Sequence, residues 1–354
     1  MKIYNGTAVL NLHGYKNCKI DLVLFPLYLL YLLYKLQTNP MGIKILNRVL
    51  LDRCRLKTIQ KKHLHELSNR IIAIDTFIYL YKFIGENKLQ ENLTQMITAF
   101  LDNNITPIFV FDGKPPKEKR NILIQRREQK KEAENKYNDI VRGLDDVSTD
   151  EAKRGMLEEM NTLKKQFIRI TEEHISLAKQ IMKSFGVSYI EAPGEADCVC
   201  VYLVRTKQAW ACLSDDMDMF VYGCSIVLRN FSLFNKTVLV YDMKQILNDL
   251  NLTMKVFRDI MVLSGTDYNI NDKTNLTETL KWYEDYKKDY KKGNIIDFYD
   301  WLIANTKYIQ DFERLQTVYR MFELNNYPEL TKYKNMDFSI KNDNKLDDIK
   351  EVIS

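Results

Sequence analysis

Four short apolar segments, each ending in an acidic residue, constrain this chain more than any other feature. They are Ile71–Asp75, Pro107–Asp112, Val187–Glu191 and Ala209–Asp215. Each is rich in β-branched and aromatic residues, and the stretches between them favour helix. This alternation predicts buried parallel strands in an α/β fold. Ligands bind outside the carboxyl ends of such strands, and here those ends carry carboxylates.

A long charged insertion separates the second and third predicted strands. Residues 117–137 favour helix throughout, and a turn-like patch follows at residues 143–149. A second helical stretch is expected over residues 150–184. After Asp267 the chain is polar and helical in pattern, and about the last 20 residues are expected to be loosely ordered.

The first 40 residues differ from the rest of the chain. Their apolar run, residues 22–34, is 13 residues long and is interrupted by Pro26. A bilayer span needs about 20 apolar residues, so we predict no membrane association. No small-residue cleavage site follows the run, which argues against a secretory signal peptide. The 45% hydrophobic and 28% charged residues are typical of a soluble globular protein, and the net charge of +5 is only compatible with nucleic-acid binding.

Acidic residues are grouped where the predicted strands and helices meet. The candidate metal ligands are Asp75, Asp112, Glu195, Asp197, Asp216, Asp218 and Asp267. A single acid after a strand is most often a helix N-cap or a turn residue. Several carboxylates at one sheet edge repel each other, however, and divalent cations would neutralise them. Hard oxygen ligands of this kind suit magnesium or manganese rather than zinc.

The insertion carries basic residues that could complement these acids. Lys119 and Arg126 are seven residues apart and therefore share one face of a helix, from which they could reach a phosphate near the metals. The alternative is a solvated charged helix, because Glu118, Glu128 and Glu132 are interspersed with the basic residues.

Five blocks of sequence together resemble one family, the flap endonuclease and xeroderma-type (XPG) structure-specific 5′ nucleases. In chain order they are Ala73-Ile-Asp75 with Tyr81, Phe109-Val-Phe-Asp-Gly-Lys-Pro-Pro116, Glu191-Ala-Pro-Gly-Glu-Ala-Asp197, Asp215-Asp-Met-Asp218 and Leu263-Ser-Gly-Thr-Asp267. The resemblance covers about residues 41–267, and five blocks in the same order make it specific.

The resemblance implies a fold, a chemistry and a set of roles. The implied fold is α/β, with a mixed, mostly parallel sheet flanked by helices (a PIN-like nuclease core), a helical arch and a C-terminal helical DNA-binding region. The implied enzyme is a phosphodiesterase with two Mg²⁺ ions per active site, for which Mn²⁺ could substitute. The seven acids named above resemble its metal ligands, and Lys119 and Arg126 resemble its catalytic basic residues.

The resemblance also implies contacts with DNA. Tyr81 matches an aromatic residue that stacks on a nucleobase, and Gly42 matches a glycine near DNA at the family's usual N-terminus. Basic residues of the insertion are predicted to add further DNA contacts: Lys114, Arg120, Arg127 and Lys130. The expected partner is branched or flapped DNA, bound by a monomer, and the expected location is intracellular, in the nucleus or at a cytoplasmic (viral) replication site.

Two departures from the family pattern keep alternatives open. Asp197 stands where the family usually has a glutamate, which is one methylene longer. Asp197 and Leu263-Ser-Gly265 are typical of the family's exonucleases. Gly113–Pro116 and the spacing of Lys119 and Arg126 are typical of its flap endonucleases. The Gly-x-Gly hairpin expected after Asp267 is replaced by residues 269–277, and we find no clamp-binding motif in the C-terminal residues. Three hypotheses for the function therefore remain: a flap endonuclease, a 5′→3′ double-strand exonuclease and a catalytically silent DNA-binding scaffold.

The expected domain organisation follows from these observations. Residues 1–40 are predicted to be an N-terminal extension that need not be native, residues 41–330 the nuclease domain with its arch at about 114–184, and residues 331–354 a tail.

Overall fold

The computed structural model describes residues 43, 45–144, 149–269, 274–291 and 296–340, together with the backbone of residues 2–4, 7–9 and 20–21. The chain divides into two compact units, residues 1–41 and 42–354. In the first unit, β1 (Lys2–Tyr4), β2 (Thr7–Val9) and β3 (Ile20–Asp21) form an antiparallel sheet. The apolar run at residues 22–34, Gly42 and residues 341–354 of the predicted tail lie outside the described residues.

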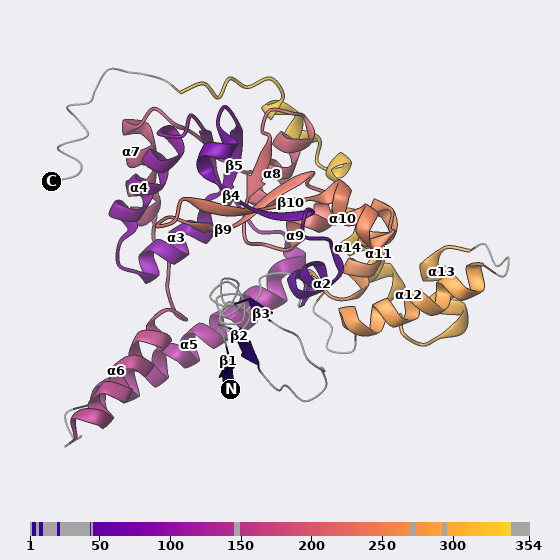
Figure 1. Cartoon of the computed structure of the whole chain (residues 1–354), viewed down its shortest axis with the longest axis horizontal. Helices are drawn as coiled ribbons and strands as arrows, with labels where there is room; N and C mark the ends of the chain where they lie inside the picture. The colour runs from indigo at the N-terminus through magenta and orange to yellow at the C-terminus, as the bar shows by residue number, and fades with distance from the viewer. Residues whose placement is uncertain are drawn as a thin grey trace. The chain divides into compact units, whose positions relative to one another are not determined.

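The second unit is built on a seven-stranded sheet in the order β4-β10-β9-β8-β5-β6-β7 (Figure 1). Its strands are β4 (Ile59–His63), β5 (Ile71–Asp75), β6 (Thr106–Phe111), β7 (Ser188–Glu191), β8 (Ala211–Leu213), β9 (Ile226–Ser232) and β10 (Thr237–Asp242). The strands from β9 to β7 pair in parallel, whereas β10 is antiparallel to both β9 and β4. This arrangement confirms the predicted mixed, mostly parallel sheet and its four predicted strands.

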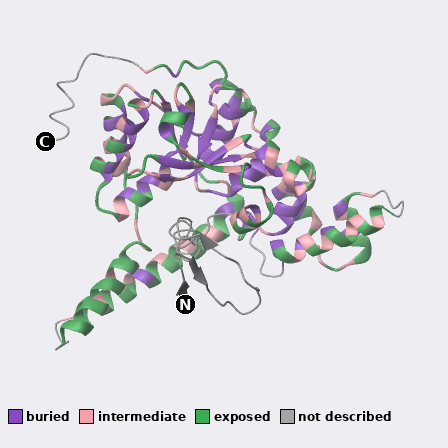
Figure 2. Ribbon diagram, in the orientation of Figure 1, coloured by how far each residue is buried: buried purple, intermediate pink, exposed green. Residues whose placement is uncertain are grey.

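Helices cover both faces of the sheet, so the core has two halves. On β5, Ile72 and Ile74 point into one half and Ala73 into the other, as the two-residue period of a strand requires. The first half is closed by α3 (Thr76–Gly85), α4 (Leu89–Leu101) and α7 (Glu172–Ser184). The second is closed by α2 (Leu46–Arg53), α8 (Ala196–Arg205), α9 (Asp218–Tyr222), α10 (Met243–Leu250) and α11 (Met254–Leu263). Figure 2 shows the sheet buried between these layers.

The C-terminal part of the unit is helical, as the sequence predicted. It comprises α12 (Leu276–Tyr290), α13 (Phe298–Asn305), α14 (Phe312–Met321) and the short 3₁₀ helices η3 (Leu324–Asn326) and η4 (Pro328–Tyr333). The helices α12, α13 and α14 pack against α11, and aromatic side chains such as Phe298, Trp301 and Phe322 lie in the shared core, whereas η4 packs against α8. Among the described residues, no helix combines the length and apolar character that crossing a bilayer would require.

The insertion forms a pair of packed helices, α5 (Arg120–Gly143) and α6 (Asp150–Lys164), preceded by the 3₁₀ turn η2 (Lys117–Lys119). Most residues of this pair are exposed (Figure 2). The segment after α6 contacts α5 again, because Lys130 Nζ donates to the carbonyl of Ile168 at 2.9 Å and the rings of Tyr137 and Phe167 lie 5.4 Å apart. These contacts tie the segment after α6 to α5.

Two details differ from the sequence-based expectation. The predicted helical stretch 150–184 is two helices, since α6 ends at Lys164 and α7 begins after Thr171, whose hydroxyl accepts the N–H of His174 at 3.3 Å as an N-cap. That second helix packs against α4 rather than on the α5–α6 pair. The strands β4, β9 and β10 were not predicted at all, although β9 continues the parallel part of the sheet next to β8.

Candidate active site

Four of the seven candidate metal ligands lie at the carboxyl ends of parallel strands. Asp75 is the last residue of β5, Asp112 directly follows β6, and Asp216 and Asp218 follow β8. The three strands are neighbours in the order β8-β5-β6 and run in parallel, so their carboxyl ends share one edge of the sheet. The fold thus brings these acids to the place where α/β sheets bind ligands.

Ser214 links two of these acids, and the sequence analysis did not single it out. Its hydroxyl donates to Asp75 Oδ2 at 3.0 Å and accepts the N–H of Asp216 at 3.1 Å. Asp75 holds the N-cap position of α3, yet its side chain makes no capping hydrogen bond. The capping role that a lone acid would normally play is therefore not the role of Asp75.

Glu195 and Asp197 are brought to the same edge by a close backbone approach. The N–H of Gly113 donates to the carbonyl of Gly194 at 2.6 Å, and a Cβ atom at position 113 would lie 2.1 Å from the carbonyl oxygen of Ala192. Only glycine fits such an approach. In addition, Asp112 Oδ1 accepts the N–H of Ala196, the first residue of α8, at 2.8 Å. Glu195, at the N-cap, and Asp197, in the first turn, thus lie beside Asp112.

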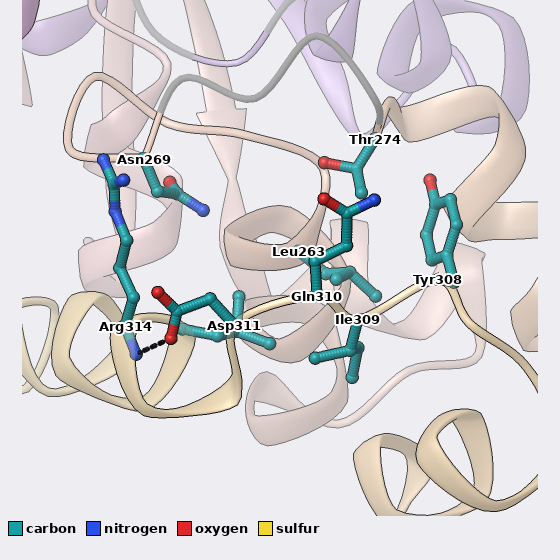
Figure 3. A pocket seen from close by; sticks show the side chains of 9 residues that line it. Leu263, Asn269, Thr274, Tyr308, Ile309, Gln310, Asp311 and Arg314 are labelled. Atoms are coloured by element: carbon teal, nitrogen blue, oxygen red, sulfur yellow. Dashed lines mark hydrogen bonds between the residues drawn. The ribbon is translucent and has the colours of Figure 1, made fainter.

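Asp267 is presented by a tight turn after α11. Gly265 has a φ of 99°, a conformation that favours glycine. The side chain of Asn269 fixes the turn, because its Oδ1 accepts the N–H of Thr266 at 2.9 Å and its Nδ2 donates to the carbonyl of Val262 at 2.7 Å. Asn269 begins the segment that replaces the expected glycine hairpin, of which residues 270–273 lie outside the described part, and it borders a pocket next to Arg314 (Figure 3).

The two candidate catalytic basic residues reach this cluster from the insertion. Lys119 is only 8% exposed, and its ammonium group pairs with Glu195 and lies 4.0 Å from Asp267 Oδ2. Arg126 Nη2 lies 2.6 Å from the same Asp267 oxygen. Both positive charges thus face one carboxylate oxygen, but the predicted shared helix face is not observed. Lys119 ends the 3₁₀ turn η2 and is the N-cap residue of α5, whereas Arg126 lies within α5.

The carboxylates of the cluster raise one another's pKa values. Burial is the largest cause for Asp75, Asp112, Asp197, Asp216 and Asp218, and the charge of a neighbouring acid adds to it in each case. For Asp112 the hydrogen bond from Ala196 opposes the rise. Burial alone would lower the pKa of Lys119, but Glu195 and the nearby aspartates outweigh it and raise that pKa instead. The cluster is thus short of positive charge even with Lys119 inside it.

The chemistry of the donors fits a hard divalent cation. All seven candidates offer carboxylate oxygens, and both oxygens of Asp218 are buried without a hydrogen-bond partner. Within the described ranges, no three Asp, Glu, His or Cys side chains are grouped as a metal site as they stand. Lys119 and Arg126 pair with oxygens of two of the candidates, Glu195 and Asp267. The assignment of the seven acids as ligands stays a prediction.

The residues predicted to contact DNA differ in exposure. Tyr81, on α3, is 40% exposed, and Lys130 Nζ lies 4.7 Å from the centre of its ring. Lys114, Arg120 and Arg127 are exposed. Their roles in binding DNA remain predictions, and the predicted contact at Gly42 falls outside the described residues.

Tyr268 is a further residue of the cluster to which the sequence analysis gave no role. Its hydroxyl donates to Glu195 Oε2, and Lys119 Nζ lies 5.0 Å from the centre of its ring. The only signal in the sequence was its position directly after Asp267.

Comparison with known proteins agrees with this geometry. The model of the XPG N-terminal domain matches residues 41–133, and that of the XPG I-region matches residues 186–267. The two matches flank most of the α5–α6 insertion and include all seven acids and both catalytic candidates.

Among curated proteins, the chain is similar to flap endonucleases. It is 30% identical to Flap endonuclease 1 of Trypanosoma cruzi over 64% of this chain and 61% of that protein. It is 27% identical to Flap endonuclease 1 of Methanococcus aeolicus over 68% of this chain and 81% of that protein. The chain thus spans about three fifths of the length of the first relative and about four fifths of the second.

Solved structures show the same fold. The catalytic core of Rad2 in complex with a DNA substrate aligns with a TM-score of 0.56 at 22% identity, over 88% of this chain and 93% of that one. Flap endonuclease-1 from Methanococcus jannaschii aligns with a TM-score of 0.50 at 24% identity, over 75% of this chain and 82% of that one. The two domain matches and the curated relatives support the XPG and flap endonuclease family, and the solved structures share the fold of this chain.

Proposed function

We propose that this protein is a structure-specific 5′ nuclease that hydrolyses DNA phosphodiesters near junctions of single and double strands. One observation carries the proposal: a carboxylate cluster at the carboxyl edge of the parallel sheet faces two basic side chains of the helical insertion. Membership of the family and the DNA bound in the Rad2 structure support the choice of substrate. Branched or flapped DNA is the proposed partner.

We infer that magnesium is the cofactor, with two ions per site. Asp75, Asp112, Glu195 and Asp197 would hold one side of the metal centre, and Asp216, Asp218 and Asp267 the other. When bound, two such ions activate a water molecule and stabilise the leaving oxygen of the scissile phosphate. The raised pKa values of the buried carboxyl groups of Asp75 and Asp218 support a site that needs added positive charge.

The basic and aromatic residues would prepare the DNA for this chemistry. Lys119 and Arg126 bring positive charge to the cluster, where both could hold the scissile phosphate and stabilise the charge that develops on it. To do so they would exchange their present carboxylate partners, Glu195 and Asp267, for the phosphate. Tyr81 presents an exposed ring on which a nucleobase could stack without sequence preference.

The endonuclease hypothesis and the exonuclease hypothesis predict different cleavage products. We would compare a gapped 5′ flap with a blunt duplex, each 5′-labelled, in magnesium and in EDTA. A flap endonuclease releases the flap as one oligonucleotide, whereas an exonuclease releases mononucleotides from the blunt 5′ end. Binding of both DNAs without cleavage in magnesium or manganese would instead favour the silent scaffold, and cleavage that persists in EDTA would contradict metal dependence.

A further inference from the structure

Tyr268 stands between a candidate metal ligand and a candidate catalytic residue. It is 2% exposed and follows Asp267 in the turn after α11. Its hydroxyl contacts Glu195, which precedes α8, and its ring lies under the ammonium group of Lys119, which belongs to η2. One side chain therefore touches two groups that come from separate parts of the chain.

The hydrogen bonds around this hydroxyl have a definite direction. A phenol has one proton, and Tyr268 uses it to donate to Glu195. The hydroxyl of Tyr222 lies 2.8 Å from that of Tyr268, so Tyr222 is the donor in this second bond. Both hydroxyl groups are buried, and a buried chain of this kind holds its acceptor in one orientation. The acceptor at the end of the chain is the carboxylate of Glu195.

We propose that Tyr268 is a positioning residue of the nuclease site, whose hydroxyl orients the carboxylate of Glu195 and whose ring holds the ammonium group of Lys119. The inference rests on the proposed function, because it assigns Glu195 to the metal centre and Lys119 to the phosphate. A hydrogen bond from a second residue fixes the direction of a ligand's free oxygen, and its removal weakens metal binding. An ammonium group over an aromatic ring is held by the charge distribution of the ring.

A purely structural role makes a different prediction. The ring of Tyr268 also packs edge-on against Phe322 at 5.3 Å, so its loss would loosen the core. Tyr268→Phe keeps this packing and the contact with Lys119 but removes the hydroxyl. Tyr268→Leu removes both the hydroxyl and the ring. The matched control is Tyr299→Phe, because Tyr299 donates its hydroxyl to the backbone carbonyl of Asp259 at 2.7 Å and not to a candidate ligand.

Two measurements separate the two parts of the proposal. The first titrates the DNA-free full-length protein with magnesium chloride and follows the rise in the thermal midpoint of unfolding. The second measures the single-turnover cleavage rate of a 5′-flap DNA at saturating magnesium. For Tyr268→Phe we expect the half-saturating magnesium concentration to rise about tenfold. Its saturated cleavage rate should stay within about threefold of the wild type.

Tyr268→Leu should show the same magnesium shift and a further loss of saturated rate of at least about threefold, because Lys119 loses its ring. An unchanged magnesium midpoint in Tyr268→Phe, or an equal shift in Tyr299→Phe, would overturn the proposal; Tyr268→Phe decides this even if Tyr268→Leu does not fold. If wild-type protein responds to magnesium but cleaves no DNA, the proposed function fails while the titration still tests Tyr268. If magnesium does not change the wild-type midpoint, the inference fails as well.

Discussion

At the scale of single residues, the buried carboxylate of Asp218 lowers the stability of the metal-free protein. Both its carboxylate oxygens are buried and lack a hydrogen-bond partner. Burial, followed by the charge of Asp216, raises the pKa of Asp218 well above its ordinary value of 3.8. A raised pKa means that the folded protein holds this proton at pH values where the unfolded chain has lost it. Stability therefore falls as the pH rises above about 3.8 towards the folded-state pKa.

Replacing this carboxylate should consequently stabilise the metal-free protein. We expect Asp218→Asn to raise the free energy of unfolding at pH 7 by about 1–3 kcal/mol. The gain should shrink as the pH falls, and it should be smallest below pH 3.8, where the aspartate is mostly neutral in the unfolded chain as well. Urea unfolding in EDTA at several pH values checks this, with Asp300→Asn, an exposed acid on α13, as the control. A loss of stability at pH 7, or a gain that does not vary with pH, would contradict the account.

Lys119 makes the second prediction at this scale. If it stabilises charge on the scissile phosphate, Lys119→Ala should lower the single-turnover cleavage rate by about 10²-fold or more, and should change DNA affinity much less. Lys117→Ala, two residues away and exposed, is the matched control. Equal losses in affinity and rate would instead make Lys119 an ordinary phosphate contact.

At the scale of elements, the sheet edge depends on how closely the residues after β6 approach those before α8. Gly113→Ala would place a Cβ atom against the backbone carbonyl of Ala192, which cannot yield as a side chain could. We expect a loss of about 1–3 kcal/mol in the free energy of unfolding. Gly155→Ala is the opposite case, because nothing lies within 4 Å of its Cβ position on α6. That helical substitution should stabilise by about 0.5–1 kcal/mol. Chemical unfolding of both variants tests the contrast, and equal effects would refute it.

The elements also show how far a sequence can be interpreted without a structure. Apolar runs that end in acids, such as Ile71–Asp75, were enough to predict the parallel strands and the edge at which their acids meet. The β9–β10 hairpin was missed, since its turn around Asn235 lacks the usual Asn-Gly or Asp-Gly signal. The register between β9 and β10 shifts between Thr237 and Leu239, and β10 also pairs with β4, which is distant in sequence.

The residues of the candidate site could be predicted from the sequence, but their contacts in the folded protein could not. The spacing predicted that Lys119 and Arg126 share one face of a helix, whereas Lys119 ends the turn η2 that precedes the helix of Arg126. The spacing could not show that Lys119 is buried against Glu195 and Asp267, residues that are far away in the chain. Ser214 and Tyr268 went unassigned because their importance comes from the hydrogen bonds to Asp75 and Glu195, which only the folded chain forms.

At the scale of the whole molecule, the N-terminal residues form a unit apart from the nuclease fold. Residues 1–41 and 42–354 are separate compact units, and the family match begins at residue 41. We predict that protein beginning at Met41 folds and cleaves DNA at least as well as the full chain. Comparing thermal unfolding and flap cleavage of the two forms tests this. Failure of the shorter protein to fold, or loss of cleavage that the full chain retains, would make the extension an integral part of the enzyme.

The central claim is that the strand-end acids bind the metal ions that drive DNA cleavage, and Asp216 tests it most directly. Single-turnover cleavage and equilibrium binding of one 5′-flap DNA should be measured for wild type, Asp216→Ala and the control Asp300→Ala. Loss of one ligand removes several kcal/mol of charge stabilisation in the transition state. We therefore predict that Asp216→Ala binds the flap with near wild-type affinity in calcium but does not cleave it in magnesium. Near wild-type cleavage by Asp216→Ala would contradict the account.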